Sequence, residues 1–316
     1  MFTVRIAAPI AVAVAVACFA PSVAADLQLT RDGQSDYEIV LEADASPSQQ
    51  FAAEELVDHL QQISGARLAV RTLDADAALP DKAIVIGSAA LARRAGVDGV
   101  QAFGDEQYLI RAAGDRLLIL GGRQRGTLYG AYAFLEHLGV RWWTPTETDV
   151  PKQASITIGV IDRREKPALE YRDIMSRQTH GEAGQLWMAR NRLNGMVWKD
   201  APAKLGGRYA FGGAKLAHTL MSLLKKHKIE ITPEMMSADA EGNRAKPGAR
   251  RAQVCFTNED AIEAMTRAVV AEYRANPDIH FVMVGQEDGH SYCHCAGCQT
   301  IAKREQSQSG PVIHFV

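Results

Sequence analysis

The composition of the sequence is that of an ordinary globular protein, not of a disordered or strongly basic one. Its 316 residues are 47% hydrophobic and 23% charged, enough apolar material for two domains with a core each. The formal net charge of −2 leaves no surplus of cations to neutralise phosphates, which argues against nucleic acid as a partner. Small neutral or acidic ligands remain compatible with this composition.

The first 25 residues have the pattern of a secretory signal peptide. Arg5 precedes an apolar run at residues 6–19, and small residues follow it as a cleavage site. A membrane-spanning helix needs about 20 apolar residues, whereas this run is shorter and contains Pro9. We therefore expect an exported protein, periplasmic or extracellular, with no membrane span. Lipid attachment at Cys18 is an alternative with less support in the sequence.

Residues 26–162 have the pattern of a small α/β domain. Short apolar runs bounded by Gly, Asp or Pro predict strands at residues 37–42, 68–71, 83–87, 108–111 and 117–120. A capping box with proline at the first helical position, Ser46 to Gln49, predicts a helix that ends at Gly65. A second helix is expected at residues 127–137. Together these elements predict a mixed sheet covered by helices.

A glycine-rich segment, residues 121–126, precedes the second of these helices. Backbone N–H groups at the start of a helix can bind phosphate. The glycine spacing matches neither the dinucleotide fingerprint nor the Walker pattern. We therefore expect a tight turn from strand to helix and no phosphate site.

Six short motifs follow one another through this domain. They are Ala52-Ala-Glu-Glu-Leu56, Ile84-Val-Ile-Gly87, Arg125-Gly-Thr-Leu-Tyr-Gly130, Phe134-Leu-Glu136, Gly139-Val-Arg-Trp-Trp-Thr-Pro145 and Val150-Pro151. In content and order they resemble the non-catalytic N-terminal domain of α-glucuronidases and β-hexosaminidases. The resemblance implies a fold for this domain but not a substrate.

From residue 163 onward the pattern changes to alternating strands and helices. Strands are predicted at residues 168–174, at 194–198, at either 234–237 or 253–256, and from Phe281 onward. Helices are predicted at residues 186–192, 216–226 and 262–273, the last capped by Thr257 or Asn258. Four such units fit the first half of a (β/α)₈ TIM-type barrel, which usually takes about 250 residues. We therefore expect an α/β protein whose barrel is C-terminally truncated at residue 316 and whose fragment alone is inactive.

A second series of motifs runs through this part of the chain. It comprises His218-Thr219, Pro233-Glu234, Cys255-Phe-Thr-Asn258, and Asp288 followed by Cys293, Cys295 and Cys298. The series resembles exported bacterial proteins of uncharacterised function that are grouped with α-glucuronidases, and it implies a glycoside hydrolase. The sequence departs from that pattern at Glu287, where a neutral amide is expected.

Two acids, Glu287 and Asp288, follow the apolar run that begins at Phe281. Barrel enzymes place their chemistry at the carboxyl ends of the strands, and glycosidic hydrolysis usually needs two carboxyl groups. Adjacent residues of an extended segment point to opposite faces, so these two do not form the pair together. We prefer Asp288 as the catalytic acid because it matches the family position, with Glu287 as the alternative. Both could instead be solvated loop acids, and the partner carboxylate is expected beyond residue 316.

Three further residues are candidates for substrate binding. Arg172 could bind a sugar hydroxyl pair or a uronate carboxylate, or form a salt bridge to Asp173 or another acid. His218 could bind a substrate hydroxyl, or be a surface or capping residue. Trp198 could stack on a sugar, or fill the barrel.

Four cysteines remain after the signal peptide: Cys255, Cys293, Cys295 and Cys298. An even number in an exported protein favours disulfides. Three cysteines within six residues and a fourth from a neighbouring unit also fit a structural zinc site. We expect either arrangement to fix the loop after Asp288, with no cofactor needed for catalysis.

The sequence thus supports three functions of different class. The first is a secreted α-glucuronidase-like hydrolase that acts on the O-glycosyl bonds of a polysaccharide or oligosaccharide. The second is a carbohydrate-binding or scaffold protein without catalysis, held by a structural cysteine cluster. The third is a zinc or thiol-redox protein built on the Cys295 to Cys298 motif. The sequence around that motif has no thioredoxin-like pattern, which argues against this third function.

Overall fold

The computed structural model describes residues 26–74, 76–174, 176–195, 201–207, 209, 211–213, 217–289 and 292–316. The predicted signal peptide with Cys18, and the segment with Trp198, lie outside the described residues, so those predictions stay untested. The chain divides into two compact units. The first runs to Arg141 and includes Asp149–Lys166, and the second comprises Trp142–Thr148 and Pro167–Val316. None of the helices in the described part of the chain is long and apolar enough to cross a membrane.

The first unit is built on a six-stranded mixed sheet. Its strands are β2 (Glu38–Glu42), β3 (Ala69–Leu73), β4 (Ala83–Gly87), β5 (Tyr108–Ala113), β6 (Arg116–Gly121) and β10 (Asp162–Glu165). Their order is β10-β5-β6-β4-β2-β3. Strands β3, β2, β4 and β6 are parallel to one another, whereas β5 and β10 pair antiparallel. The predicted mixed sheet is confirmed, with each of its five predicted strands in place.

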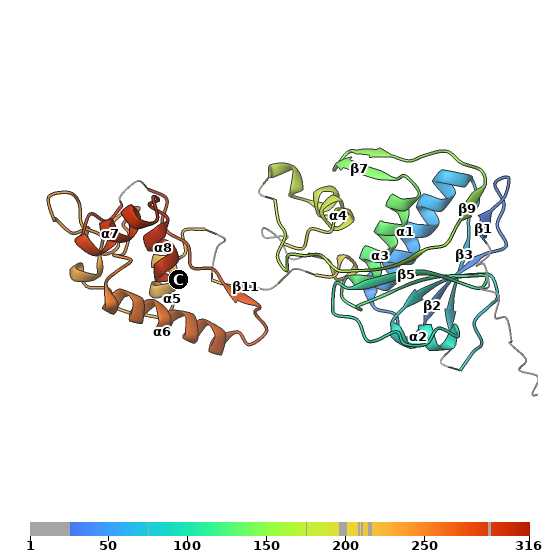
Figure 1. Cartoon of the computed structure of the whole chain (residues 1–316), viewed down its shortest axis with the longest axis horizontal. Helices are drawn as coiled ribbons and strands as arrows, with labels where there is room; N and C mark the ends of the chain where they lie inside the picture. Colours follow the sequence, from blue (N-terminus) through green and yellow to red (C-terminus); the bar gives the residue numbers. More distant parts are fainter. Residues whose placement is uncertain are drawn as a thin grey trace, which may run out of the picture. The chain divides into compact units, whose positions relative to one another are not determined.

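Helices cover both faces of this sheet. They are α1 (Pro47–Ser64), α2 (Ala89–Arg94) and α3 (Gly126–His137). Figure 1 shows α1 and α3 on one face and α2 on the other. The predicted capping box begins α1, because the Gln49 backbone N–H donates to Ser46 Oγ and the Ser46 N–H donates to Gln49 Oε1 at 2.8 Å. Gly65, with φ of 89°, ends this helix in the left-handed region.

The central strands are apolar along their whole length because both of their faces are covered. Every residue of β4 is buried. Val85 and Leu118 pack with Leu91 of α2 in one cluster. Since side chains alternate along a strand, Ile84 and Ile86 point to the face opposite that of Val85. This explains why the sequence shows continuous apolar runs in place of alternation.

The glycine-rich segment before α3 is the predicted tight turn. A Cβ on Gly122 would lie 2.2 Å from the Gly104 carbonyl oxygen, and one on Gly126 would lie 2.2 Å from that of Gln107. The backbone N–H groups of these two glycines donate to Gln107 O at 2.9 Å and to Asp105 O at 2.7 Å. They are therefore bonded to protein carbonyls, in agreement with a structural turn.

Two small antiparallel pairs complete the sheet structure up to residue 166, and the sequence patterns did not predict them. One joins β1 (Leu27–Thr30) to β9 (Ile156–Ile158), and the other joins β7 (Arg141–Thr144) to β8 (Glu147–Asp149). These strands have three or four residues each, too few for a period to show.

The second unit consists mainly of helices, short strands and irregular segments. Its helices are α4 (Glu182–Arg190), α5 (Leu220–Lys226), α6 (Glu259–Ala275), α7 (Ala296–Arg304) and α8 (Gly310–Phe315), with 3₁₀ turns η1 (Arg177–Thr179), η2 (Ala203–Leu205) and η3 (Pro233–Met235). Strands β11 (Phe211–Gly212) and β12 (Phe281–Val282) pair in parallel. Leu220 and Leu224 of α5 and Met265 of α6 contribute to one buried core.

The α/β class and the strand that begins at Phe281 are confirmed, whereas the strand predicted at residues 168–174 is wrong and the one predicted at 194–198 lies mainly outside the described residues. Residues 168–174 form no strand, and the parallel partner of β12 is Phe211–Gly212, which the sequence patterns missed. The two alternatives for the third strand instead meet in an antiparallel bridge, Met236 to Val254. In the described part of the unit the expected half barrel is therefore represented by one parallel strand pair with α5 and α6.

Candidate functional site

The carboxylate of Glu287 is held in place by its neighbours just beyond the carboxyl end of β12. Gln253, itself 5% exposed, accepts a hydrogen bond from the Glu287 backbone N–H at 3.1 Å and donates one to the Glu287 carbonyl at 2.7 Å. The backbone N–H of Met221, in the first turn of α5, donates to Glu287 Oε1 at 3.2 Å. Backbone and side chain of this acid are thus both fixed.

Glu287 lines an open hollow of about 600 Å³ along α5. The charged and polar groups at its wall are His218, Ser222, Lys225, Lys228, Glu230 and Glu287. Apolar side chains, among them Met221 and Ile231, form the rest. The hollow therefore brings two carboxylates, Glu230 and Glu287, together with cationic side chains.

His218 reaches this hollow through an unusual backbone conformation. Its φ is 57°, in the left-handed region, and its Nδ1–H donates to the Gln286 carbonyl at 3.2 Å. The Thr219 hydroxyl next to it donates to Met283 O at 2.7 Å and accepts from the Gly285 N–H at 2.7 Å. These bonds tie the start of α5 to the segment that leads to Glu287, so His218 and Glu287 share one wall.

Asp288 has a different environment from Glu287. Its side chain is 68% exposed, and its Oδ2 lies 3.5 Å from Arg251. It is not among the residues that line the hollow of Glu287. The two adjacent acids thus have different neighbours. The preference for Asp288 as the catalytic acid stays a prediction.

Arg172 is bonded to the main chain. Its Nε donates to the Arg192 carbonyl at 2.6 Å, and its guanidinium also donates to the Glu170 carbonyl at 3.3 Å. The Asn194 side chain also accepts a hydrogen bond from the Arg172 backbone N–H at 2.9 Å. Arg172 is not among the residues that line the hollow of Glu287, and Trp198 lies outside the described residues.

Another acid of this unit, Glu272 on α6, is buried and has a structural role. It is 1% exposed and accepts hydrogen bonds from Lys226 Nζ at 2.7 Å and from His227 Nε2 at 2.7 Å. The Gly213 N–H donates to it at 3.1 Å. Burial raises the pKa of this carboxyl, but these donors outweigh burial and lower the pKa to about 2. Glu272 therefore links α5, α6 and the segment after β11 and is not a proton donor.

The four cysteines converge, as the sequence predicts. Their Sγ atoms all lie within 4.8 Å of one another, and Cys255, Cys293 and Cys298 are buried. Hydrogen bonds from the Cys293 and Cys298 thiols hold the pKa of Cys255 below its usual range, against the effect of burial. The same interaction with Cys255 raises the pKa of Cys293 and of Cys298. The four thiols are thus close enough to interact strongly with one another.

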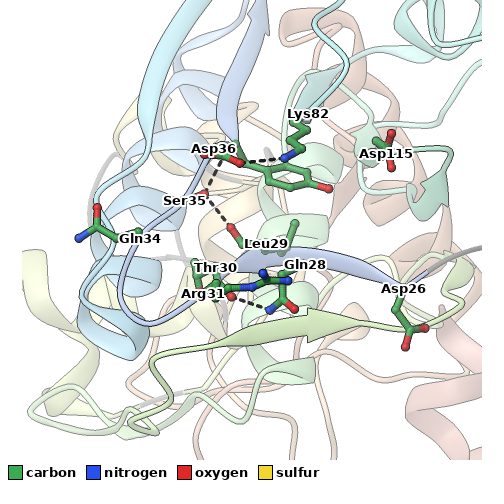
Figure 2. A pocket seen from close by; sticks show the side chains of 11 residues that line it. Asp26, Gln28, Leu29, Thr30, Arg31, Gln34, Ser35, Asp36, Lys82 and Asp115 are labelled. Atoms are coloured by element: carbon green, nitrogen blue, oxygen red, sulfur yellow. Dashed lines mark hydrogen bonds and ion pairs between the residues drawn. The ribbon is translucent and has the colours of Figure 1, made fainter.

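A separate hollow of about 420 Å³ lies beside β1 in the first unit. Figure 2 shows that its charged side chains include Asp36 and Lys82, which form an ion pair at 2.8 Å. The hydrogen bond from Lys82 lowers the pKa of Asp36. None of the residues predicted from the sequence lines this hollow. We therefore place the candidate site in the second unit.

Two residues of the candidate site were missed from the sequence. Gln253 falls within residues 253–256, one of the two alternatives for a predicted strand. Glu230 lies in a polar stretch after α5 and belongs to no motif. Their roles depend on tertiary contacts, so no local pattern identifies Glu230. Gln253 precedes Cys255 by two residues, and that proximity to a predicted site residue is the one signal that pointed to it.

Two families match the chain. The family described as Domain of unknown function (DUF4838) matches residues 142–316, and Glycosyl hydrolase family 67 N-terminus matches residues 25–134. A curated relative, Alpha-glucuronidase A of Emericella nidulans, is 38% identical over 104 residues, which are 32% of this chain and 12% of that protein. The resemblance of the first unit to α-glucuronidases is thereby confirmed.

Solved structures with likeness to the chain include three glycosidases. A GH115 4-O-methyl-α-glucuronidase with specificity for decorated arabinogalactans has a TM-score of 0.43 and 15% identity, over 92% of this chain and 41% of that one. The chitobiase of Flavobacterium johnsoniae has a TM-score of 0.41 and 14% identity, over 93% and 49%. The GH20 β-N-acetylhexosaminidase of Streptomyces coelicolor A3(2) has a TM-score of 0.39 and 13% identity, over 93% and 64%. The chain thus spans less than two thirds of each of these proteins.

Proposed function

The chain belongs to the family described as Domain of unknown function (DUF4838), and from this premise we propose that it is part of a glycoside hydrolase of α-glucuronidase type. The substrate class is a polysaccharide or oligosaccharide, and the reaction is hydrolysis of an O-glycosyl bond. The match of the first unit to Glycosyl hydrolase family 67 N-terminus supports this proposal. So does the similarity to Alpha-glucuronidase A of Emericella nidulans.

The observation that carries the proposal is the placement of Glu287. Its carboxylate lines a hollow beyond the carboxyl end of β12, and a second carboxylate, Glu230, lines the same hollow. Glycosidic hydrolysis usually needs two carboxyl groups around the scissile bond. Hydrogen bonds to its backbone and to its side chain hold this acid in position at the wall of the hollow.

The charges around Glu287 support an acidic sugar as substrate. Lys225 and Lys228 line the hollow, and a uronate carries a carboxylate that an ammonium group can bind. Lys228 is held close to the end of α5 by its φ of 55° and by the bond from its N–H to the Lys225 carbonyl at 3.1 Å. We therefore assign these lysines the role of uronate recognition.

Two acids remain as candidates for the catalytic carboxyl, and the geometry favours Glu287. Asp288 matches the family position, but its carboxylate is exposed and lies near Arg251. Glu287 is partly buried and lines the hollow. We propose Glu287 as the acid that faces the sugar, with Asp288 as the alternative.

The experiment is a hydrolysis screen with the full-length protein that contains this chain. Aryl glycosides and natural oligosaccharides, with and without uronate, are incubated with the protein, and released sugars are identified by mass spectrometry. We expect release of a uronic acid. Changing Lys225 and Lys228 together to Ala should raise KM for uronate substrates and leave KM for neutral glycosides unchanged.

A matched control is Lys303→Ala, an exposed lysine on α7 that does not line the hollow. It should leave both KM values unchanged. Sugar binding without release of any product would contradict the proposal and favour the carbohydrate-binding scaffold. Release of neutral sugars only, with KM unaffected by the lysine changes, would contradict the uronate assignment.

We also propose that residues 26–316 alone are inactive. Val270 and Tyr273 of α6 are each 40% exposed, and they line an apolar hollow of about 330 Å³ together with Phe281 and Val284. An exposed apolar face of this kind favours association. The purified fragment should bind a hydrophobic dye and release no sugar, and a monomeric, dye-negative fragment that cleaves aryl glucuronides would contradict this.

Export of the protein is part of the proposal and rests on the signal-peptide pattern of residues 1–25. Fractionation of expressing bacteria should recover the protein in the periplasm or medium, with its N-terminus near residue 26. Full-length protein in the cytoplasm with residues 1–25 still attached would contradict it.

A further inference from the structure

We propose that Cys255, Cys293, Cys295 and Cys298 bind one structural Zn²⁺ ion. The four sulfurs come from two separate segments of the second unit, Cys255 and residues 293–298, and lie within 4.8 Å of one another. The inference goes beyond the proposed glycosidase function, because the site would stabilise the unit whatever reaction it carries.

Two of the separations between the sulfurs, both from Cys255, are close to those of a tetrahedral metal site. Cys255 Sγ lies 3.6 Å from Cys295 Sγ and 3.9 Å from Cys298 Sγ. Zinc binds thiolate sulfur at about 2.3 Å, so the edge of a regular ZnS₄ tetrahedron is about 3.8 Å. Two disulfides would instead require two close pairs at about 2.05 Å. Cys255 is nearly equidistant from two different sulfurs, so the arrangement selects no pair.

Hydrogen-bond donors surround the sulfurs. The Ala238 N–H points at Cys293 Sγ at 3.4 Å, and the Cys298 N–H points at Cys295 Sγ at 3.5 Å. The hydroxyl oxygen of Thr257 lies 3.5 Å from Cys295 Sγ and 3.4 Å from Cys298 Sγ. Donors around ligand sulfurs offset the negative charge of a tetrathiolate site and orient its ligands.

The local sequence explains how the four ligands are presented. Cys295 is the N-cap of α7 and Cys298 lies in its first turn, so the Cys-Ala-Gly-Cys spacing places both sulfurs at one helix end. A Cβ on Gly297 would lie 2.6 Å from Thr257 Oγ1, so this position needs glycine. Cys255 follows the Met236 to Val254 bridge and approaches α7 from the other side.

The chemistry of the ligand set indicates a structural role. Four cysteine ligands close a zinc site, whereas catalytic zinc keeps an open position beside histidine or carboxylate ligands. Three of the four cysteines are buried. The ion would join Cys255 to Cys293 and so fix the loop that follows Glu287. A hydrogen bond from the His294 N–H to Ala238 O at 2.8 Å also holds this loop.

The first test is metal analysis of the purified chain, residues 26–316, prepared without added chelator. We expect one zinc per chain and four thiols that react only after the metal is released. The variants Cys255→Ser and Cys298→Ser should retain less than half of the zinc. The matched control His294→Asn changes an exposed residue between two of the ligands and should retain all of it.

A second measurement does not depend on how well the cysteine variants fold. Replacement of zinc by Co²⁺ in the unaltered chain should give the intense visible absorption bands of tetrahedral cobalt with four thiolates, and addition of zinc should abolish them. Two disulfides found by mass spectrometry of the non-reduced protein would overturn the proposal. So would bound iron in place of zinc, four free thiols without metal in folded protein, or loss of metal from His294→Asn equal to that from Cys255→Ser.

Discussion

In the first unit the contacts that hold the fold are mainly apolar and join long strands to helices, whereas in the second many of them are polar or sulfur contacts between short segments. Strand β4 is buried at every position. The second unit has an apolar core around α5 and α6, but its loops are positioned by Gln253, by Glu272 and by the four cysteines. The comparison teaches that a regular sheet supports the first unit, and that individual side chains position the candidate site.

Removal of the proposed zinc ion is the change with the largest expected effect on this comparison. Structural zinc in small domains contributes an apparent free energy on the order of 10 kcal/mol. Chelation should therefore unfold the second unit around α7 and leave the first unit folded. Hydrogen exchange of the full chain with and without chelator measures this, and equal loss of protection in both units would contradict the account.

A cavity in the sheet should destabilise the first unit and leave the second unit folded. Ile84 in β4 is 0% exposed, and Ile84→Ala should lower the free energy of unfolding of the first unit by about 2–5 kcal/mol. Hydrogen exchange of the full chain measures protection in each unit separately. The expected result is loss of protection in the first unit with unchanged protection in the second, and equal loss in both units would contradict it.

Glu272 tests whether a single polar group holds the second unit. Glu272→Gln removes the charge that Lys226 and His227 contact and should lower the free energy of unfolding by about 1–3 kcal/mol. Because the pKa falls from 4.5 to about 2 on folding, the stabilising effect is complete above pH 4.5 and is lost as the pH falls toward 2.

Chemical denaturation followed by tryptophan fluorescence between pH 2 and 6 measures this dependence. The Glu272→Gln variant should show a flatter decline in stability than the unaltered chain below pH 4.5. Parallel declines in the two proteins would show that Glu272 makes no such contribution.

The cap of α1 has the smallest expected effect. Ser46→Ala removes the acceptor of the Gln49 N–H and should cost about 1 kcal/mol in the first unit. The conservative variant Ser46→Thr keeps that acceptor and should cost less than Ser46→Ala. Thermal unfolding followed by circular dichroism compares them, and a larger loss for Thr than for Ala would contradict the capping role.

The same contrast explains what could be predicted from the sequence. Strands β2 to β6, helix α1 with its Ser46 cap, and α3 follow from local periodicity and turn residues, because a regular sheet repeats its pattern along the chain. In the second unit only the helices have enough length to show a period. Helix α6 was predicted with a cap at Thr257 or Asn258, and the structure has Asn258 as its cap. Strand β11 has two residues, and its pairing with β12 is non-local.

The candidate site was predictable in part for the same reason. The four cysteines and the adjacent acids Glu287 and Asp288 carry chemical signals in their residue types and spacing, so the sequence predicts them as site residues, with Asp288 preferred to Glu287. The position of Glu230 in the hollow and the two hydrogen bonds between Gln253 and the Glu287 backbone depend on tertiary contacts, which the spacing of residues in the sequence does not reveal. The bonds of Arg172 to backbone carbonyls could likewise not be read from its neighbours in sequence.

The most direct test of the proposed function is a comparison of kcat/KM for Glu287→Gln and Asp288→Asn in the full-length protein. A positioned acid contributes about 10²–10⁴-fold, so Glu287→Gln should lower kcat/KM for an aryl glucuronide by that factor, whereas Asp288→Asn should change it less than tenfold. The loss in Glu287→Gln should be larger for poor leaving groups than for activated ones. Unchanged turnover in Glu287→Gln, with activity abolished in Asp288→Asn, would contradict the assignment of the hollow beside α5 as the site of the reaction.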